Sequence, residues 1–177
     1  MRRIAIGVAL AALTIAGLAQ SAAARPIPGQ ASILVRTSGT ITGPTGSRTS
    51  TLALTPATVS LKTLDRLGWK DRDALQEPHL WVFTMDSTKV LGRTIDDGKP
   101  CPLCDTAAQE MAAALAVDPQ VTRVEHGDTG GLDAEGDAYL DRLNDDVWVR
   151  VHALPGSTWF YMDAYHPWLH GEVDVHA

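Results

Sequence analysis

The sequence has little of what several large functional classes require. Lysine and arginine total 15 against 21 acidic residues, which gives a net charge of −6. Because clustered Lys and Arg bind nucleic-acid phosphates, this balance argues against a nucleic-acid partner and against anionic membrane surfaces. The sequence also lacks a glycine-rich phosphate loop, a serine nucleophile elbow and an H-E-x-x-H pair. It therefore carries no motif of a nucleotide-binding protein, a serine hydrolase or a zinc protease.

An apolar run that could cross a membrane is also missing. The stretch from Ile4 to Ala19 has about 16 residues, whereas a spanning helix needs roughly 20. It follows a basic start and precedes Ala22-Ala23-Ala24, the small-residue pattern that signal peptidase accepts. We therefore expect residues 1–24 to be a cleaved signal peptide, with no stable membrane anchor afterwards. The mature protein would be exported, to a periplasm or to the medium.

Cysteine is scarce, and the two that occur, Cys101 and Cys104, lie close together. In an oxidising compartment such a pair forms a structural disulfide, works as a redox couple or holds a metal. Pro102 predicts that a helix begins directly after Cys101, where the positive end of the helix dipole favours the thiolate. We therefore take Cys101 as the candidate attacking thiol and Cys104 as its resolving partner in a thiol-disulfide oxidoreductase. An inert disulfide is the alternative, so enzyme activity stays open.

Metal binding by the cysteines would need further ligands. His166 and His170 have an H-x3-H spacing, and Glu172 follows closely. A helix would place both imidazoles on one face, but Pro167 and Gly171 disfavour a helix there. We therefore expect a solvated C-terminal segment, assign no metal site and expect no cofactor.

The second hypothesis is a noncatalytic binding module with a structural disulfide. Residues 147–151 alternate apolar and polar, which predicts a half-buried strand, and residues 158–162 return as its hairpin partner after a Pro-Gly turn. Aromatic side chains on the two strands would form one face, either packed in the core or open to an unknown protein or small molecule. The candidate binding residues are Trp148, Arg150, His152, Trp159 and Tyr161.

The order of elements predicts an α+β fold, a single small domain over residues 25–177. We expect a mostly antiparallel or mixed sheet with two or three helices. Leucines at helical spacing predict a short helix over 61–67, Pro102 opens a second that ends at Asp118, and Asp133 opens a third that runs through Leu143. Strands are expected near residues 33–35, 51–54, 80–85, 90–91, 121–124, 147–151 and 158–162.

Overall fold

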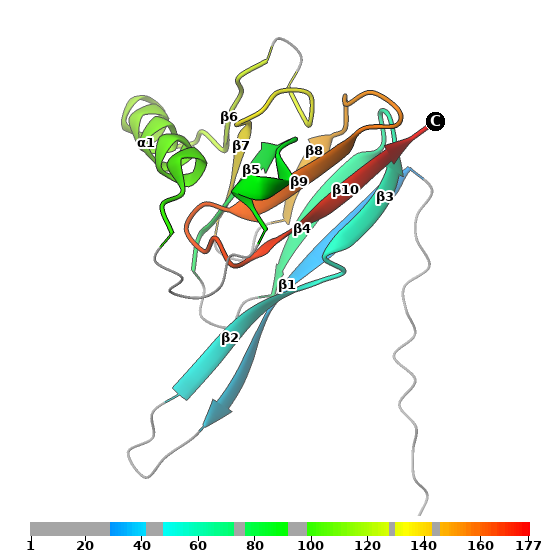
Figure 1. The fold of residues 1–177 in the computed structure, drawn as a ribbon. Helices are drawn as coiled ribbons and strands as arrows, with labels where there is room; N and C mark the ends of the chain where they lie inside the picture. The colour runs from blue at the N-terminus through cyan, green and yellow to red at the C-terminus, as the bar shows by residue number, and fades with distance from the viewer. Residues whose placement is uncertain (1–28, 42–47, 73–76, 92–98, 128–129, 143–145) are drawn as a thin grey trace, which may run out of the picture.

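The computed structural model describes residues 29–41, 48–72, 77–91, 99–127, 130–142 and 146–177. The expected signal peptide lies outside these residues. The described part contains ten β-strands in two sheets and one α-helix, α1 (Pro102–Val117) (Figure 1). The expected α+β fold with two or three helices is therefore wrong, because the chain folds as a mostly β, two-sheet sandwich.

The two sheets differ in size. The four-stranded sheet has the order β2 (Arg48–Thr55), β1 (Gln30–Ile41), β4 (Arg66–Arg72), β8 (Asp146–Arg150). The six-stranded sheet has the order β3 (Thr58–Lys62), β10 (His170–His176), β9 (Thr158–Asp163), β5 (His79–Thr84), β7 (Ala138–Asp141), β6 (Arg123–Val124). Both are mixed, because β1 runs parallel to β4 and β10 runs parallel to β3 while the other pairs are antiparallel.

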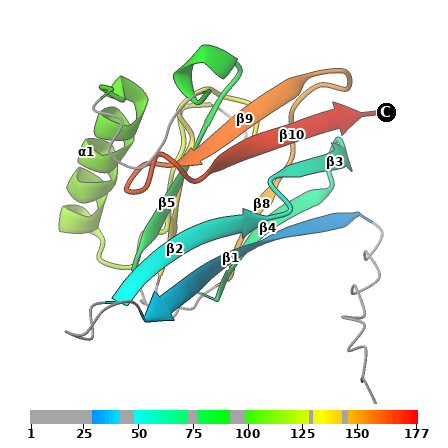
Figure 2. The ribbon, with the colours of Figure 1, turned by 60° about the horizontal axis from the view of Figure 1, so that its bottom comes forward.

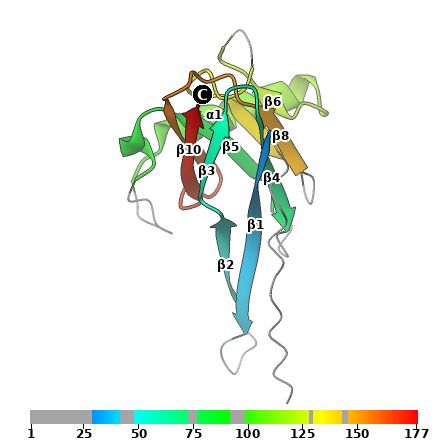
Figure 3. The ribbon, with the colours of Figure 1, turned by 90° about the vertical axis from the view of Figure 1, so that its right-hand side faces the viewer.

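Two apolar cores make a three-layer arrangement. The larger core lies between the sheets and contains Trp69 of β4 with Trp81 and Tyr161 of the six-stranded sheet. The smaller core lies between the other face of the six-stranded sheet and α1, which covers that face (Figure 2). The side chains of β5 and β9 therefore alternate between the two cores, as the pleat of a strand requires. β1 and β2 continue beyond the sandwich as a two-stranded ribbon (Figure 3).

The helix after the cysteine pair is confirmed. Cys101 is the N-cap residue, Pro102 stands in the first turn, and the helix ends at the C-cap Asp118. Its buried residues face the smaller core: Cys104, Ala107 and Met111. Among the described residues no helix has the length and apolar character that a membrane span would need.

The helices expected over 61–67 and from Asp133 onward are both wrong. The first region forms β3 and β4, joined by a turn in which Leu64 has a φ of 73°. Burial in β3 alternates with a period of two. Leu61 and Leu67 are buried in β3 and β4, whereas Leu64 is exposed in the turn, so the three leucines do not form one helical face. The second region is a series of turns followed by β7, in which all four residues are buried. Because both faces of β7 are packed against other elements, its sequence does not alternate between apolar and polar residues, and this alternation is the usual sign of a strand.

Two expected strand pairings are also wrong. Val90 and Leu91 do not return as a strand, because Asp86 caps a short 3₁₀ turn, η1 (Ser87–Lys89). β8 and β9 are not hairpin partners either: β8 pairs with β4, whereas β9 pairs with β5 and β10. The segment between β8 and β9 thus crosses from one sheet to the other.

Candidate functional site

Three metal-ligating side chains meet where β5 begins and β9 ends. β5 and β9 are antiparallel with Trp81 opposite Asp163, so His79 and the turn after Asp163 lie at the same end of the sheet. One ligand atom each of His79, Asp163 and His166 lies within 4.8 Å of the others. We call these residues the His-Asp-His cluster. Two imidazoles and one carboxylate form a donor set that transition-metal ions use in proteins.

Asp163 organises the cluster by accepting four hydrogen bonds. Its Oδ1 accepts from the backbone N–H groups of Leu80 and Tyr165, each at 3.0 Å. Its Oδ2 lies 2.7 Å from Nδ1 of His79 and 2.6 Å from Nδ1 of His166. The backbone bonds fix the carboxylate between strand β5 and the turn that carries His166. The two imidazoles are therefore aimed at a single oxygen.

Aromatic packing holds both rings in place. His79 stacks on Trp81 at a centroid distance of 5.7 Å, and His166 meets Trp168 edge-on at 5.2 Å. His79 and Asp163 have fully buried side chains, while the side chain of His166 is 13% exposed. An ion would therefore reach the cluster from the His166 side.

Contacts within the cluster shift the pKa values of Asp163 and His166 against the effect of burial. Burial disfavours the Asp163 carboxylate, but the hydrogen bonds from His166 and His79 outweigh it and lower the pKa of Asp163. Burial likewise opposes protonation of His166, yet the hydrogen bond and charge of Asp163, with those of Glu77, raise its pKa. The contacts between Asp163 and His166 therefore favour the charged form of each group.

Glu77 lies behind His166, on the side of the ring away from Asp163. Its Oε2 lies 3.1 Å from Nε2 of His166, and its side chain is 45% exposed. Nδ1–H now donates to Asp163, and once that proton leaves, an Nε2–H that donates to Glu77 would keep the Nδ1 lone pair available to an ion. A carboxylate behind a ligating histidine is the usual partner that orients the ring and raises its basicity.

The cysteine pair lies on the opposite face of the same sheet. Cys101 and Cys104 form a disulfide, and they are 8% and 3% exposed. Cys101 Sγ accepts a hydrogen bond from the N–H of Cys104 at 3.3 Å, which helps to cap α1. This burial favours a structural role in the oxidised protein, and thiol-disulfide exchange stays a prediction.

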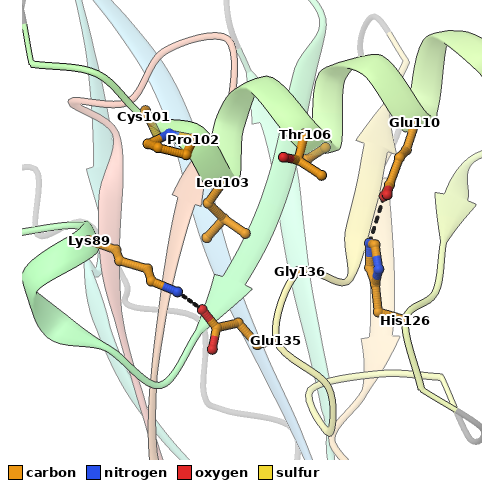
Figure 4. Close-up of a pocket in the computed structure, with 10 residues that line it drawn as sticks. Lys89, Cys101, Pro102, Leu103, Thr106, Glu110, His126, Glu135 and Gly136 are labelled. Atoms are coloured by element: carbon orange, nitrogen blue, oxygen red, sulfur yellow. Dashed lines mark hydrogen bonds and ion pairs between the residues drawn. The ribbon is translucent and has the colours of Figure 1, made fainter.

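A pocket of about 540 Å³ opens beside the disulfide (Figure 4). Cys101 and the first turns of α1 form one wall, and the 3₁₀ turn with the loop before β7 forms the other. Two contacts between charged or titratable side chains line it: Nε2 of His126 lies 2.8 Å from Oε2 of Glu110 on α1, and Lys89 contacts Glu135 within the second wall. The pocket gives Cys101 its path to solvent.

The candidate aromatic face is split between the two sheets. Trp159 and Tyr161 are 4% and 0% exposed and belong to the core between the sheets. Trp148 and His152 are half-buried and Arg150 is exposed, as expected for the outward face of β8. Trp148 lies near the cations of Arg66 and Lys70, at 5.4 and 5.5 Å from its ring centroid. The five residues do not form one platform, and a binding role for the β8 residues stays a prediction.

Sequence reasoning considered one member of the His-Asp-His cluster as a ligand, assigned no metal site there and missed the other two members. His166 was a candidate ligand, but its supposed partners do not join it: Nδ1 of His170 lies 3.3 Å from the Pro167 carbonyl, and Glu172 lies within β10. His79 and Asp163 were missed, because they lie 84 residues apart. The only sequence signal for Asp163 was its place between a strand and a turn that contains a histidine.

The strands of this chain resemble those of some solved structures. No family model matches the chain, and no curated protein matches it. Among solved structures it is similar to auracyanin B, with 20% identity, coverage of 86% of this chain and 92% of that one, and a TM-score of 0.44. It is also similar to a purple cupredoxin from Nitrosopumilus maritimus, with 16% identity, 82% and 98% coverage, and a TM-score of 0.41. Likenesses this distant leave the chemistry of this chain to be inferred from its own residues.

Proposed function

We propose that this protein binds a divalent transition-metal ion through His79, Asp163 and His166, and that it does so after export from the cytoplasm. The single observation that carries the proposal is the convergence of two imidazole nitrogens on one buried carboxylate oxygen. Zn²⁺ and Cu²⁺ are the ions best suited to such a nitrogen and oxygen donor set.

The spacing of the donors needs only a small adjustment. Tetrahedral ligands with bonds of about 2.1 Å to an ion lie about 3.4 Å apart, whereas the Nδ1 to Oδ2 distances here are 2.6 and 2.7 Å. The present distances are those of hydrogen bonds, so an ion would replace the bridging protons. Each Nδ1 to Oδ2 distance would then increase by less than about 1 Å. Metal binding would therefore release protons.

The donor set of the proposed site differs from that of a blue-copper centre. A blue-copper centre uses a cysteine thiolate beside two histidines. Here Asp163 supplies an oxygen, and both cysteines of the sequence are joined to each other. The proposed site would bind Cu²⁺ without the intense colour of a copper-thiolate bond.

The test is titration of the chelator-stripped, purified protein with Zn²⁺ and with Cu²⁺ by calorimetry, in parallel with a His166→Gln variant. We expect one ion per chain for the natural protein and a loss of affinity of at least about tenfold for the variant. His170→Gln is the matched control, because His170 is a nearby histidine that bonds a backbone carbonyl outside the cluster. Equal affinities of the natural protein and His166→Gln, with both folded by circular dichroism, would overturn the proposal.

A further inference from the structure

Three sulfur atoms meet in the core between the six-stranded sheet and α1. Sδ of Met162 lies 3.6 Å from Sγ of Cys101 and 3.3 Å from Sγ of Cys104. Met162 is fully buried, and both cysteines are also buried. A methionine in contact with both sulfurs of a disulfide places a thioether where two thiolates would form on reduction.

The spacing of these sulfurs suits a trigonal metal centre. Three sulfurs with metal bonds of about 2.3 Å lie about 4 Å apart when they surround an ion in a plane. The Met162 sulfur lies 3.6 Å from the Cys101 sulfur and 3.3 Å from the Cys104 sulfur. These distances are about 0.4 and 0.7 Å shorter than the spacing in a trigonal centre. The remaining change is separation of the two cysteine sulfurs, which cleavage of their bond permits.

The helix start favours the thiolates that such a centre needs. Cys101 precedes the first turn of α1, and the N–H of Cys104 donates to its sulfur. The free N–H groups and the dipole of a helix N-terminus lower the pKa of a thiol there. Two buried thiolates without a cation would repel each other, and an ion bound between them would remove most of that cost.

We propose that the reduced protein binds a soft monovalent ion, Cu⁺, through Cys101, Cys104 and Met162. Thiolates bind both Cu⁺ and Zn²⁺, but zinc sites use Cys, His and carboxylate ligands, so a thioether as the third donor favours Cu⁺. The inference does not depend on the cluster at Asp163, which lies on the other face of the sheet and offers harder donors. The protein would then hold two metal sites of opposite preference, one on each side of β9.

The chemistry has two balanced steps. A dithiol reductant transfers two electrons to the Cys101–Cys104 disulfide, whose S–S bond breaks to give two thiols while the reductant closes to its own disulfide. Cu⁺ then replaces the two thiol protons, which leave to solvent, and the copper keeps its oxidation state. The pocket beside α1 gives the reductant and the ion access to Cys101.

The experiment is anaerobic competition for Cu⁺ between the protein and the chromophoric chelator bicinchoninate. The full chain is compared before and after reduction, together with Met162→Leu. We expect one Cu⁺ per reduced chain, none at this site in the oxidised chain, and an affinity for Met162→Leu lower by at least about tenfold. X-ray absorption should show three sulfur neighbours in the natural protein and two in the variant.

Met111→Leu is the matched control, because Met111 is buried in the same core but lies seven residues, or about 10 Å, along α1 from Cys104. It should bind Cu⁺ as the natural protein does. Equal Cu⁺ affinity for Met162→Leu and Met111→Leu, or no Cu⁺ binding by the reduced natural protein, would overturn the inference. His166→Gln should leave Cu⁺ binding unchanged, so failure here is distinguishable from failure of the divalent site.

Discussion

Met162 and Asp163 are neighbours in β9 whose side chains face opposite sides of the six-stranded sheet. Met162 contacts the disulfide in the core under α1, whereas Asp163 joins His79 and His166 on the face of Trp81. Alternation along a strand requires this separation. One short segment of β9 therefore positions a sulfur donor and an oxygen donor for two different chemistries.

Replacing Asp163 should strongly destabilise the fold. Asp163→Ala removes the acceptor for four hydrogen bonds and leaves the imidazoles of His79 and His166 without their shared partner. Breaking a buried charged network of this kind typically costs about 3–5 kcal/mol. Asp163→Asn keeps an acceptor for the two backbone N–H groups and should lose less. Urea denaturation of both variants checks this, and a loss below about 1 kcal/mol for Asp163→Ala would contradict the assigned role.

The Asp163–His166 pair should make stability depend on pH in the metal-free protein. Burial opposes charge on both, but their mutual contacts prevail, so the pKa of His166 is raised and that of Asp163 is lowered. The His166 contribution is complete below its unfolded pKa of about 6.5 and is lost as pH rises through the higher folded value. The Asp163 contribution is complete above about pH 4 and is lost as pH falls further.

Thermal melting in the presence of a chelator measures this dependence. The melting temperature of the natural protein should exceed that of His166→Gln most clearly between about pH 4 and 6.5, and the difference should shrink at higher pH. A difference that stays constant from acid to alkaline pH would show that the pair does not titrate as its contacts indicate.

The sequence correctly predicted the helices and strands whose identifying residues all lie within one short segment. Pro102 after Cys101 marked the start of α1, and Asp118 marked its end. The strand at 147–151 was visible because Val147, Val149 and Val151 alternate with polar or aromatic residues. In each case the deciding interactions lie within a few residues of one another.

The features that failed depend on contacts between distant segments. Residues 138–141 contain no alternation because β7 packs on both faces, so nothing local distinguished it from a helix. The partner of β8 was mistaken because the Pro-Gly turn suggested a hairpin, whereas burial of Trp159 and Tyr161 draws β9 into the other sheet. Two members of the His-Asp-His cluster were missed for the same reason, since β5 must pair with β9 before His79 can meet Asp163.

Gly171 should tolerate a methyl group poorly. A Cβ at this position would overlap the carbonyl oxygen of Ala57 and the hydroxyl of Tyr161, and these two groups are hydrogen-bonded to each other at 2.9 Å. Because a backbone carbonyl cannot rotate away, Gly171→Ala should cost about 2–4 kcal/mol. Gly156→Ala is the control: its φ of 85° is strained for alanine, but no atom crowds it, so it should cost only about 1–2 kcal/mol. Equal losses in urea denaturation would refute the close approach of β10 to Ala57.

Asp137 should be a site where removal of a charge stabilises the protein. Burial raises its pKa to about 6, and the nearby Asp133 and Glu125 add to that effect against an opposing hydrogen bond from the His126 N–H. The folded state therefore keeps a proton that the unfolded chain releases near pH 4, and stability falls as pH rises from about 4 to about 6.

In the natural protein the backbone N–H of His126 donates to Oδ1 of Asp137 at 2.8 Å. The Asp137→Asn side chain does not titrate, and its oxygen can still accept this hydrogen bond. At about 1.4 kcal/mol per pKa unit the rise from 3.8 to about 6 corresponds to roughly 3 kcal/mol, and burial of the replacement amide offsets part of it. We therefore expect the variant to gain about 1–2 kcal/mol at pH 7.5 and to match the natural protein near pH 4. Urea denaturation at the two pH values gives both numbers. A variant that is less stable at pH 7.5 would mean that the Asp137 carboxylate makes a favourable contact that outweighs its burial.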